Sequence, residues 1–129
     1  MAVLQWGILG AGKISTDFCL AIQTLDKAKH KLKAVGARNA VRAGEFANNF
    51  NMDRFYGSYE ELVRDPEVSI VYIGTINTTH KDLTILALRN GKHVLCEKPA
   101  ALNAIELEEI LQAAKEAGLF FMEVSQVFL

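Results

Sequence analysis

The sequence contains a glycine turn of the kind that can hold a phosphate. Gly10-Ala11-Gly12-Lys13-Ile14 follows a short apolar segment and opens a stretch with apolar residues at helical spacing. Glycines permit a tight turn and leave room for a pyrophosphate at the N–H groups that begin a helix. The third glycine position of the dinucleotide fingerprint is occupied by Ser15. Two glycines also suit an ordinary strand-to-helix turn, so the place of the motif after the first strand matters more than its composition.

Two arginines follow the second apolar segment, where the ribose of a bound nucleotide would be recognised. An acidic residue at this point accepts hydrogen bonds from the ribose hydroxyls and selects NAD. Arg38 instead predicts a contact with a 2′-phosphate, and Arg42, one helical turn later, can add a second cation. The presence of an arginine in place of an acidic residue predicts NADP as the cofactor, with NAD less favoured. It also disfavours S-adenosylmethionine. The alternative is that both arginines are solvated surface residues.

A polar group of residues follows the fourth strand-like segment. It comprises Thr75, Asn77, Thr78 and His80. Hydroxyl, amide and imidazole groups suit a ribose or a nicotinamide edge. We therefore predict that Thr75, Asn77 and His80 contact the cofactor. The alternative for His80 is a capping or solvated residue at the start of a helix.

The triplet Glu97-Lys98-Pro99 follows the fifth strand-like segment and is the most informative motif. An amine at a strand end lies at the cleft of a parallel sheet, where it can orient a substrate hydroxyl. We predict that Lys98 is catalytic and also contacts the cofactor, together with Glu97. The bond before the proline is a candidate for the cis form. An exposed surface lysine is the alternative, and Cys96 is expected to be a small buried hydrophobe.

These motifs require strands that end at one common edge. Short apolar and β-branched segments alternate along the chain with stretches of helical periodicity, which indicates an α/β fold with a parallel sheet and right-handed crossovers. The predicted architecture is a Rossmann-type doubly wound parallel sheet in a single domain. The six predicted strands are residues 4–9, 32–37, 55–56, 69–73, 93–96 and 119–124.

The helix boundaries are marked by capping residues. In the last predicted helix, Leu107, Ile110, Leu111 and Ala114 form an apolar stripe that we expect to face the core. Polar side chains suited to helix starts and glycines suited to helix ends complete the pattern. The predicted caps are Asn39, Ser58 with Glu61, and Asn103 with Glu106, and the predicted closing glycines are Gly91 and Gly118.

Composition excludes several classes of protein. The 129 residues include 14 basic and 15 acidic side chains, and a net charge of -1 offers no field for nucleic acid or an anionic membrane. We expect neither partner, and no metal site. The two cysteines are far apart in the sequence, which suits a reducing compartment, so the predicted location is cytoplasmic.

The motifs together resemble the glucose-fructose oxidoreductase, inositol dehydrogenase and rhizopine-catabolism (Gfo/Idh/MocA) family. The resemblance covers residues 2–123 and is carried by four stretches and a final short one. These are Trp6-Gly7-Ile8, Tyr56-Gly57-Ser58-Tyr59-Glu60-Glu61-Leu62, Val71-Tyr72-Ile73-Gly74-Thr75, Val94-Leu95-Cys96-Glu97-Lys98-Pro99 and Phe121-Met122-Glu123. The family usually has a proline where this chain has Ile76, so we expect a different backbone in that loop.

The resemblance implies a fold and an activity. It implies a pyrophosphate at the glycine turn, NADP selected by Arg38, and Lys98 beside the nicotinamide. The implied reaction transfers hydride between NADP and a small-molecule substrate, a trans-dihydrodiol or an aldose such as D-xylose. The implied acid-base partner of Lys98 belongs to a C-terminal substrate domain.

The same resemblance divides the chain. Residues 1–124 are predicted to be the NAD(P)-binding domain and residues 125–129 a divergent end, with the substrate domain of the family absent. Full-length members are dimeric, whereas this chain is expected to be monomeric or prone to aggregate. We expect little or no catalysis by the chain alone. The alternatives are an NADPH-binding or partner-binding module without catalysis, and a truncated product without function.

Overall fold

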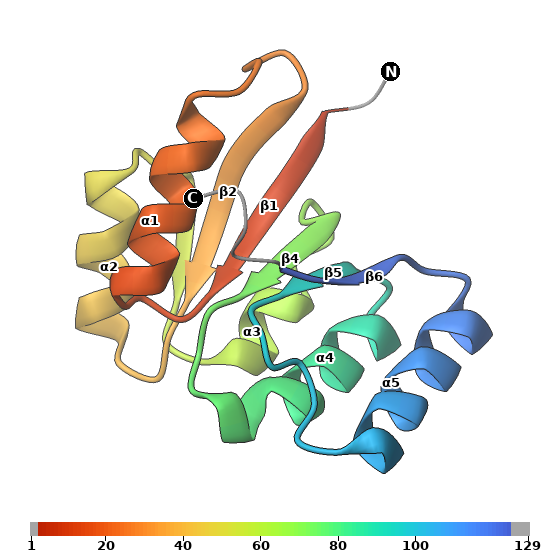
Figure 1. The fold of residues 1–129 in the computed structure, drawn as a ribbon. Helices are drawn as coiled ribbons and strands as arrows, with labels where there is room; N and C mark the ends of the chain where they lie inside the picture. Colours follow the sequence, from red (N-terminus) through yellow and green to blue (C-terminus); the bar gives the residue numbers. More distant parts are fainter. Residues whose placement is uncertain (1–2, 125–129) are drawn as a thin grey trace.

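One parallel sheet forms the centre of the molecule in the computed structural model, which describes residues 3–124. The strands lie in the order β3-β2-β1-β4-β5-β6, and every neighbouring pair is parallel. The predicted doubly wound fold is therefore confirmed (Figure 1). The strands are β1 (Leu4–Leu9), β2 (His30–Gly36), β3 (Arg54–Tyr56), β4 (Ile70–Ile73), β5 (His93–Cys96) and β6 (Phe121–Glu123).

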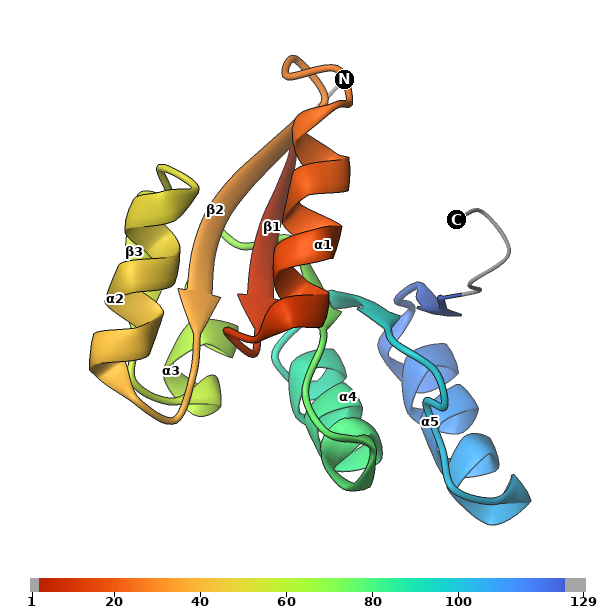
Figure 2. The ribbon, with the colours of Figure 1, turned by 60° about the vertical axis from the view of Figure 1, so that its left-hand side comes forward.

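Helices cover both faces of this sheet. Figures 1 and 2 show α1 and α2 on one face and the other three α-helices on the opposite face. Each face has its own hydrophobic core, and the central strand β4 is buried at all four positions, which explains its continuous apolar composition. The helices are α1 (Lys13–Gln23), α2 (Ala40–Asn49), α3 (Tyr59–Val63), the 3₁₀ turn η1 (Asn77–Thr79), α4 (His80–Arg89) and α5 (Ala104–Ala117).

Three helices begin at the side chains that the sequence indicated. Asn39 accepts hydrogen bonds from two backbone N–H groups of α2, Ser58 accepts from Glu61 N, and Asn103 accepts from Glu106 N. Gly118 ends α5 in the left-handed region, with φ of 67°. Local capping chemistry therefore fixes the ends of these helices.

The predicted apolar stripe of α5 is only half correct. Ile110 and Ala114 are buried, but Leu107 is 41% exposed and Leu111 is 50% exposed. The physical reason is the place of α5, which packs beside α4 under the sheet edge that ends in the short strand β6. A helix at an edge contacts its neighbours along a narrow stripe, so the flanking leucines face outward.

The chain reverses its direction of winding between β1 and β4. Strands β2 and β3 lie on one side of β1, while β4, β5 and β6 lie on the other. The loops that follow β1 and β4 therefore diverge to opposite faces and leave a crevice at the carboxyl ends of the strands. We call this end of the sheet the carboxyl edge.

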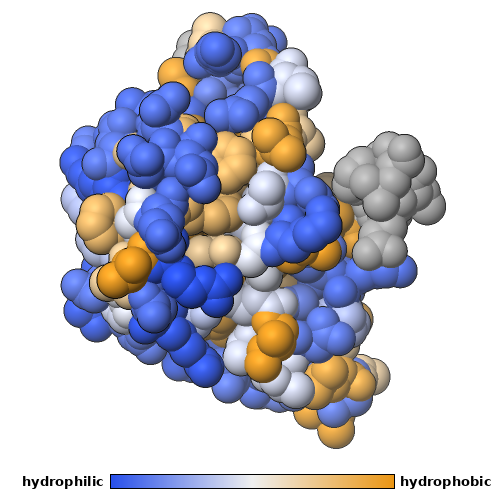
Figure 3. Space-filling view, turned by 90° about the vertical axis from the view of Figure 1, so that its left-hand side faces the viewer, coloured by the Kyte–Doolittle hydropathy of each residue, from blue (hydrophilic) through white to orange (hydrophobic). Residues whose placement is uncertain are grey.

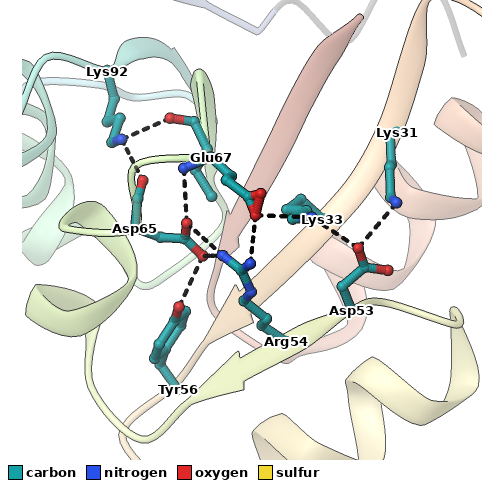
Figure 4. A network of polar contacts seen from close by, with 9 residues as sticks. Lys31, Lys33, Asp53, Arg54, Tyr56, Asp65, Glu67 and Lys92 are labelled. Atoms are coloured by element: carbon teal, nitrogen blue, oxygen red, sulfur yellow. Dashed lines mark hydrogen bonds and ion pairs between the residues drawn. The ribbon is translucent and has the colours of Figure 1, made fainter.

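The opposite end of the sheet carries a network of charged side chains, which we call the amino-edge network (Figure 4). Arg54 Nη1 donates to both carboxylate oxygens of Asp65 at 2.8 and 2.9 Å, and the same guanidinium also contacts Glu67. The Tyr56 hydroxyl donates to Asp65 Oδ2 at 2.8 Å. The complete network comprises Lys31, Lys33, Asp53, Arg54, Tyr56, Asp65, Glu67 and Lys92.

The pKa values of this network reflect its pairing. Burial raises the pKa of the Asp65 carboxyl, but the Glu67 N–H, Arg54 and Tyr56 outweigh it and leave that pKa below its ordinary value. Lys92 is buried and its Nζ donates to two carbonyl oxygens, Asp65 O at 2.6 Å and Val68 O at 2.7 Å. Burial lowers the pKa of Lys92. The network ties β2, β3 and the starts of β4 and β5 together.

The surface carries hydrophobic side chains in separate places. Figure 3 shows the side that lies at the left in Figure 1, where hydrophilic surface predominates between isolated orange patches. Ile105 on α5 is 71% exposed and Phe120, before β6, is 51% exposed. No helix within residues 3–124 has the length and apolar character needed to cross a membrane. The predicted tendency to aggregate stays a prediction.

Candidate nucleotide site

A cavity of about 380 Å³ opens at the carboxyl edge, between the ends of β1, β2 and β4. Six residues that the sequence nominated line it, which brings together three separate motifs. The lining residues are Gly10, Ala11, Gly12, Ala37, Arg38, Asn39, Arg42, Tyr59, Gly74, Thr75, Ile76 and Thr79.

The first two glycines of the turn have different tasks. Gly10 has φ of 104°, and a Cβ there would lie 2.9 Å from the carbonyl oxygen of Gly74, so another residue at this position would strain the turn. A Cβ at Gly12 would meet nothing within 4 Å. The backbone of Gly12 therefore faces open space in which a ligand can approach.

Ser15 occupies the third glycine position without separating the helix from the sheet. Its side chain is fully buried, and its Oγ lies 2.5 Å from where a Cβ on Gly74 would stand. Gly74 directly follows β4, and its lack of a side chain leaves room for Ser15 Oγ and the Tyr72 ring. Close packing of α1 on the sheet therefore depends on Gly74.

The start of α1 is open to an anion. Gly12 is its N-cap and makes no side-chain capping bond, and the first turn contains no acidic residue. The positive end of the helix dipole is therefore uncompensated within α1. Lys13 and Ile14 do not line the cavity, since Lys13 points outward and pairs with Asp17 at 3.3 Å, and Ile14 is 41% exposed.

The two arginines flank the open turn. Arg38 follows β2, and Asn39 fixes the start of α2 by accepting from the backbone N–H groups of Val41 and Arg42. Arg42 Nη2 reaches toward Ala11 O, at a long 3.5 Å. Neither Arg38 nor Arg42 forms an ion pair with any residue in 3–124.

The loop after β4 contains Ile76 in an extended conformation. Ile76 has φ of -71° and ψ of 150°, which is a conformation that proline also adopts. The expected difference in backbone between this loop and that of the family stays a prediction. Asn77 begins η1 and is exposed outside the cavity.

His80 is held by two backbone carbonyls. Its Nδ1 lies 2.8 Å from Pro99 O and its Nε2 lies 2.9 Å from Thr75 O, while the residue is 1% exposed. Each ring nitrogen thus lies within hydrogen-bond distance of a carbonyl oxygen, and the nitrogen that carries the N–H donates. The imidazole lies between the loop after β4 and the loop after β5. A contact between His80 and a cofactor stays a prediction.

Glu97 is held by Tyr72, whose ring packs against Phe18. The Tyr72 hydroxyl donates to Glu97 Oε1 at 2.7 Å, and the Tyr72 ring stacks on Phe18 of α1 with centroids 3.8 Å apart. Burial, followed by the Glu97 contact, raises the pKa of Tyr72 well above its ordinary value, so the phenol remains a donor. Lys98 is exposed, forms no ion pair with a described residue, and precedes Pro99 through a cis bond.

Glu97 and Lys98 lie beside the cavity rather than in its wall. They follow β5, which is separated from β1 by β4. Cys96 is free and buried, and burial raises its pKa to about 12, so its thiol is not a nucleophile. No cluster of three or more potential metal ligands occurs in residues 3–124.

The structure also brings in residues that the sequence interpretation missed. A second cavity of about 320 Å³ adjoins the first and shares Arg38, Tyr59 and Thr79 with it. Tyr59 belongs to a stretch that carries the family resemblance, and no pattern in the sequence assigned it to the site. Thr79 lies four residues after Thr75. This spacing of two threonines in a polar loop is the sequence signal that could have indicated a role for Thr79 in the site.

A doubly wound sheet with a glycine turn at its switch point and a cavity there defines a nucleotide-binding Rossmann domain. Residues 4–124 match the profile of the oxidoreductase family with an NAD-binding Rossmann fold, GFO_IDH_MocA. The chain belongs to this family, which confirms the resemblance drawn from its motifs.

The following known proteins are similar to this chain and longer than it. Trans-1,2-dihydrobenzene-1,2-diol dehydrogenase of Homo sapiens is 48% identical over 120 residues, which are 93% of this chain and 36% of that protein. An NAD-binding oxidoreductase from Klebsiella pneumoniae superposes with a TM-score of 0.88 at 31% identity, over 95% of this chain and 34% of the other. Biliverdin reductase from Synechocystis, solved with biliverdin and NADP+, gives 0.83 at 29% identity, over 93% and 37%. The chain spans about a third of the length of the curated relatives it matches.

Proposed function

We propose that this chain is the NADP-binding domain of a dehydrogenase. The observation that carries the proposal is the pair of arginines, Arg38 and Arg42, which line the same cavity as the glycine turn and have no ion-pair partner among the described residues. An unpaired guanidinium at the end of β2 suits a 2′-phosphate, because planar N–H donors bind phosphate oxygens in bidentate fashion.

The residues of the carboxyl edge fit the cofactor. Its pyrophosphate would lie at the uncapped start of α1, beside the open space at Gly12. Its nicotinamide would lie toward Glu97 and Lys98. When bound, the cofactor accepts or supplies the hydride of the reaction. The role of Lys98 is to orient a substrate hydroxyl, and Tyr72 holds the neighbouring Glu97 in place.

The proposed substrate is a small molecule that carries vicinal hydroxyl groups, either a trans-dihydrodiol or an aldose such as D-xylose. The support is the name of the human relative, which is a dihydrodiol dehydrogenase and matches this chain at 48% identity. Because the chain covers 36% of that protein, catalysis and substrate remain proposals for the chain itself.

A calorimetric titration with NADP and with NAD tests the cofactor assignment. We expect NADP to bind more tightly, and Arg38→Ala to weaken NADP binding by about 10- to 100-fold, the worth of a charge-assisted hydrogen bond, with little effect on NAD. Arg64→Ala is the matched control. This substitution removes the same charge, but from an exposed residue at the end of α3. Equal affinity for the two cofactors, or equal losses in the two variants, contradicts the proposal.

A second assay separates a cofactor domain from an enzyme. The reduction of NADP at 340 nm is followed with a trans-dihydrodiol and with D-xylose, at saturating cofactor. We expect binding with negligible turnover, because the proposed acid-base partner of Lys98 belongs to a segment outside these residues. Turnover that disappears in Lys98→Ala would establish catalysis by the chain alone.

A further inference from the structure

The hydroxyl groups of the loop after β4 have a fixed direction of hydrogen bonding. Thr79 Oγ1 lies 2.6 Å from Ile76 O, and a carbonyl oxygen can only accept, so Thr79 donates its single proton there. Thr79 Oγ1 also lies 2.7 Å from Thr75 Oγ1. With the Thr79 proton committed, the Thr75 hydroxyl must be the donor in this second bond. Thr75 Oγ1 therefore has only lone pairs left for a ligand.

The backbone keeps this arrangement in place. Thr75 O is engaged by His80 Nε2 at 2.9 Å, and Thr79 N donates to Ile76 O at 3.0 Å. Both threonines line the 380 Å³ cavity, in which Arg38 and Arg42 provide cations. The cavity thus has one side that attracts anions and one side that accepts hydrogen bonds.

We infer that Thr75 Oγ1 accepts a hydrogen bond from the 3′-hydroxyl of the adenosine ribose and so sets which ribose oxygen can carry the phosphate. This inference rests on the proposed function. The adenosine half is the relevant one because Arg38 and Arg42 share the cavity, whereas Glu97 and Lys98 do not line it. A phosphate at the 2′ position then faces the arginines. A phosphate at the 3′ position meets the lone pairs of Thr75 and is disfavoured.

Two isomeric probes test the inference: adenosine 2′,5′-bisphosphate and adenosine 3′,5′-bisphosphate. They have the same atoms and charge and differ only in which ribose oxygen carries phosphate. We expect the wild-type chain to prefer the 2′,5′ isomer in calorimetric titrations. Thr75→Val should weaken that isomer by about fivefold, the worth of one neutral hydrogen bond, and Thr75→Ser should restore it.

Thr79→Val gives the sharper readout. It removes the acceptor for the Thr75 proton, so Thr75 can then donate to a phosphate, and the preference for the 2′,5′ isomer should shrink by about fivefold. Thr24→Val is the matched control, because Thr24 Oγ1 makes the same kind of bond to Ala21 O at 2.6 Å, at the far end of α1. We expect this variant to leave the preference unchanged.

The possible outcomes separate the two proposals. If wild-type chain binds NADP but Thr79→Val leaves the isomer preference as it was, or Thr75→Val leaves the affinity for the 2′,5′ isomer intact, the inference is wrong and the proposed function stands. If a folded wild-type chain binds neither NADP nor either isomer, the proposed function fails first.

Discussion

The two edges of the sheet use positive charge in opposite ways. At the amino edge, Lys33 and Arg54 each contact two carboxylates, and Asp65 is fully buried in the network. At the carboxyl edge, Arg38, Arg42 and Lys98 form no ion pair with any residue of the described range. The same side-chain types are bound to the protein at one end and left for a ligand at the other.

The comparison distinguishes stability from function. A buried ion pair that loses one partner leaves an uncompensated charge, so the amino edge is sensitive to substitution. An exposed cation without a partner contributes little to folding. Changes at the amino edge should therefore alter unfolding, and changes at the carboxyl edge should alter binding.

The largest effect is expected at Asp65. Asp65→Ala removes the acceptor for Arg54, Tyr56 and the Glu67 backbone N–H together, and we expect the free energy of unfolding to fall by about 2 to 4 kcal/mol. Urea unfolding followed by far-ultraviolet circular dichroism measures this.

A matched change on an exposed pair calibrates the result. Asp17→Ala breaks the pair with Lys13, whose side chain is 86% exposed, and should cost less than about 0.5 kcal/mol. Similar losses for the two variants would remove the distinction between the amino-edge network and ordinary surface pairs.

The next largest effect on stability is expected at Gly74, where α1 packs closely on the sheet at the carboxyl edge. Gly74→Ala places a Cβ 2.5 Å from Ser15 Oγ and 2.8 Å from Tyr72 Cε2, and we expect a loss of about 1 to 3 kcal/mol from overpacking. Adding Ser15→Gly should recover part of the loss, because it removes the closer contact. Thermal unfolding of both single variants and the double variant gives the coupling, and simple additivity would refute the shared-space account.

Acidic pH should reduce the stability that the amino-edge network contributes, whereas this contribution is complete at neutral pH. The pKa values of Asp53, Asp65 and Glu67 are lowered in the folded state: Asp53 by Lys33 and Lys31, Glu67 by Arg54, and Asp65 by the contacts described above. A lowered folded pKa contributes stability that is complete above the unfolded pKa and is lost as pH falls toward the folded one.

The free energy of unfolding should therefore be level from about pH 7 to 5 and decline below that. Urea titrations at a series of pH values measure it. Asp65→Asn should show a shallower decline, since one of the three titrating groups is absent. An equally steep decline in this variant would assign the acid sensitivity elsewhere.

The smallest effect on stability is expected at the unpaired arginines. Arg42→Ala should change the free energy of unfolding by no more than about 0.5 kcal/mol, because its contact with Ala11 O is long and exposed. Thermal unfolding with and without NADP separates the contribution of Arg42 to folding from its contribution to NADP binding. Without NADP the variant should unfold at the same temperature as the wild type, and with NADP its unfolding temperature should rise less. A large loss without ligand would show that Arg42 belongs to the fold.

Local signals made most of the fold predictable. The caps at Asn39, Ser58 and Asn103 depend on residues three or fewer positions away, and all three are confirmed. The strand over Leu4–Leu9 is confirmed at both ends, and the glycine turn that follows explains why it stops at Leu9. β2 begins at His30, two residues earlier than expected, since parallel pairing with β1 extends it.

The site was predictable as a place, and less so as a set of contacts. Residues at strand ends converge by topology, and Gly10, Arg38 and Thr75 line one cavity as the sequence suggested, while their contact with a cofactor stays a prediction. The side-chain pairs of the amino-edge network lie 9 to 34 positions apart, and no local pattern indicates such pairs. The direction of the Thr75–Thr79 bond depends on a carbonyl position that only the folded loop defines.

The close approach of Ser15 to Gly74 also bears on how dinucleotide sites are recognised in sequences. A search that requires three glycines in the first turn would pass over this chain, although the turn itself is intact. The position that must lack a side chain for α1 to pack on the sheet is Gly74, 59 residues after Ser15, where a Cβ would meet both Ser15 Oγ and Tyr72 Cε2. A motif that combines the two glycines of the turn with the glycine after the fourth strand would retrieve this chain.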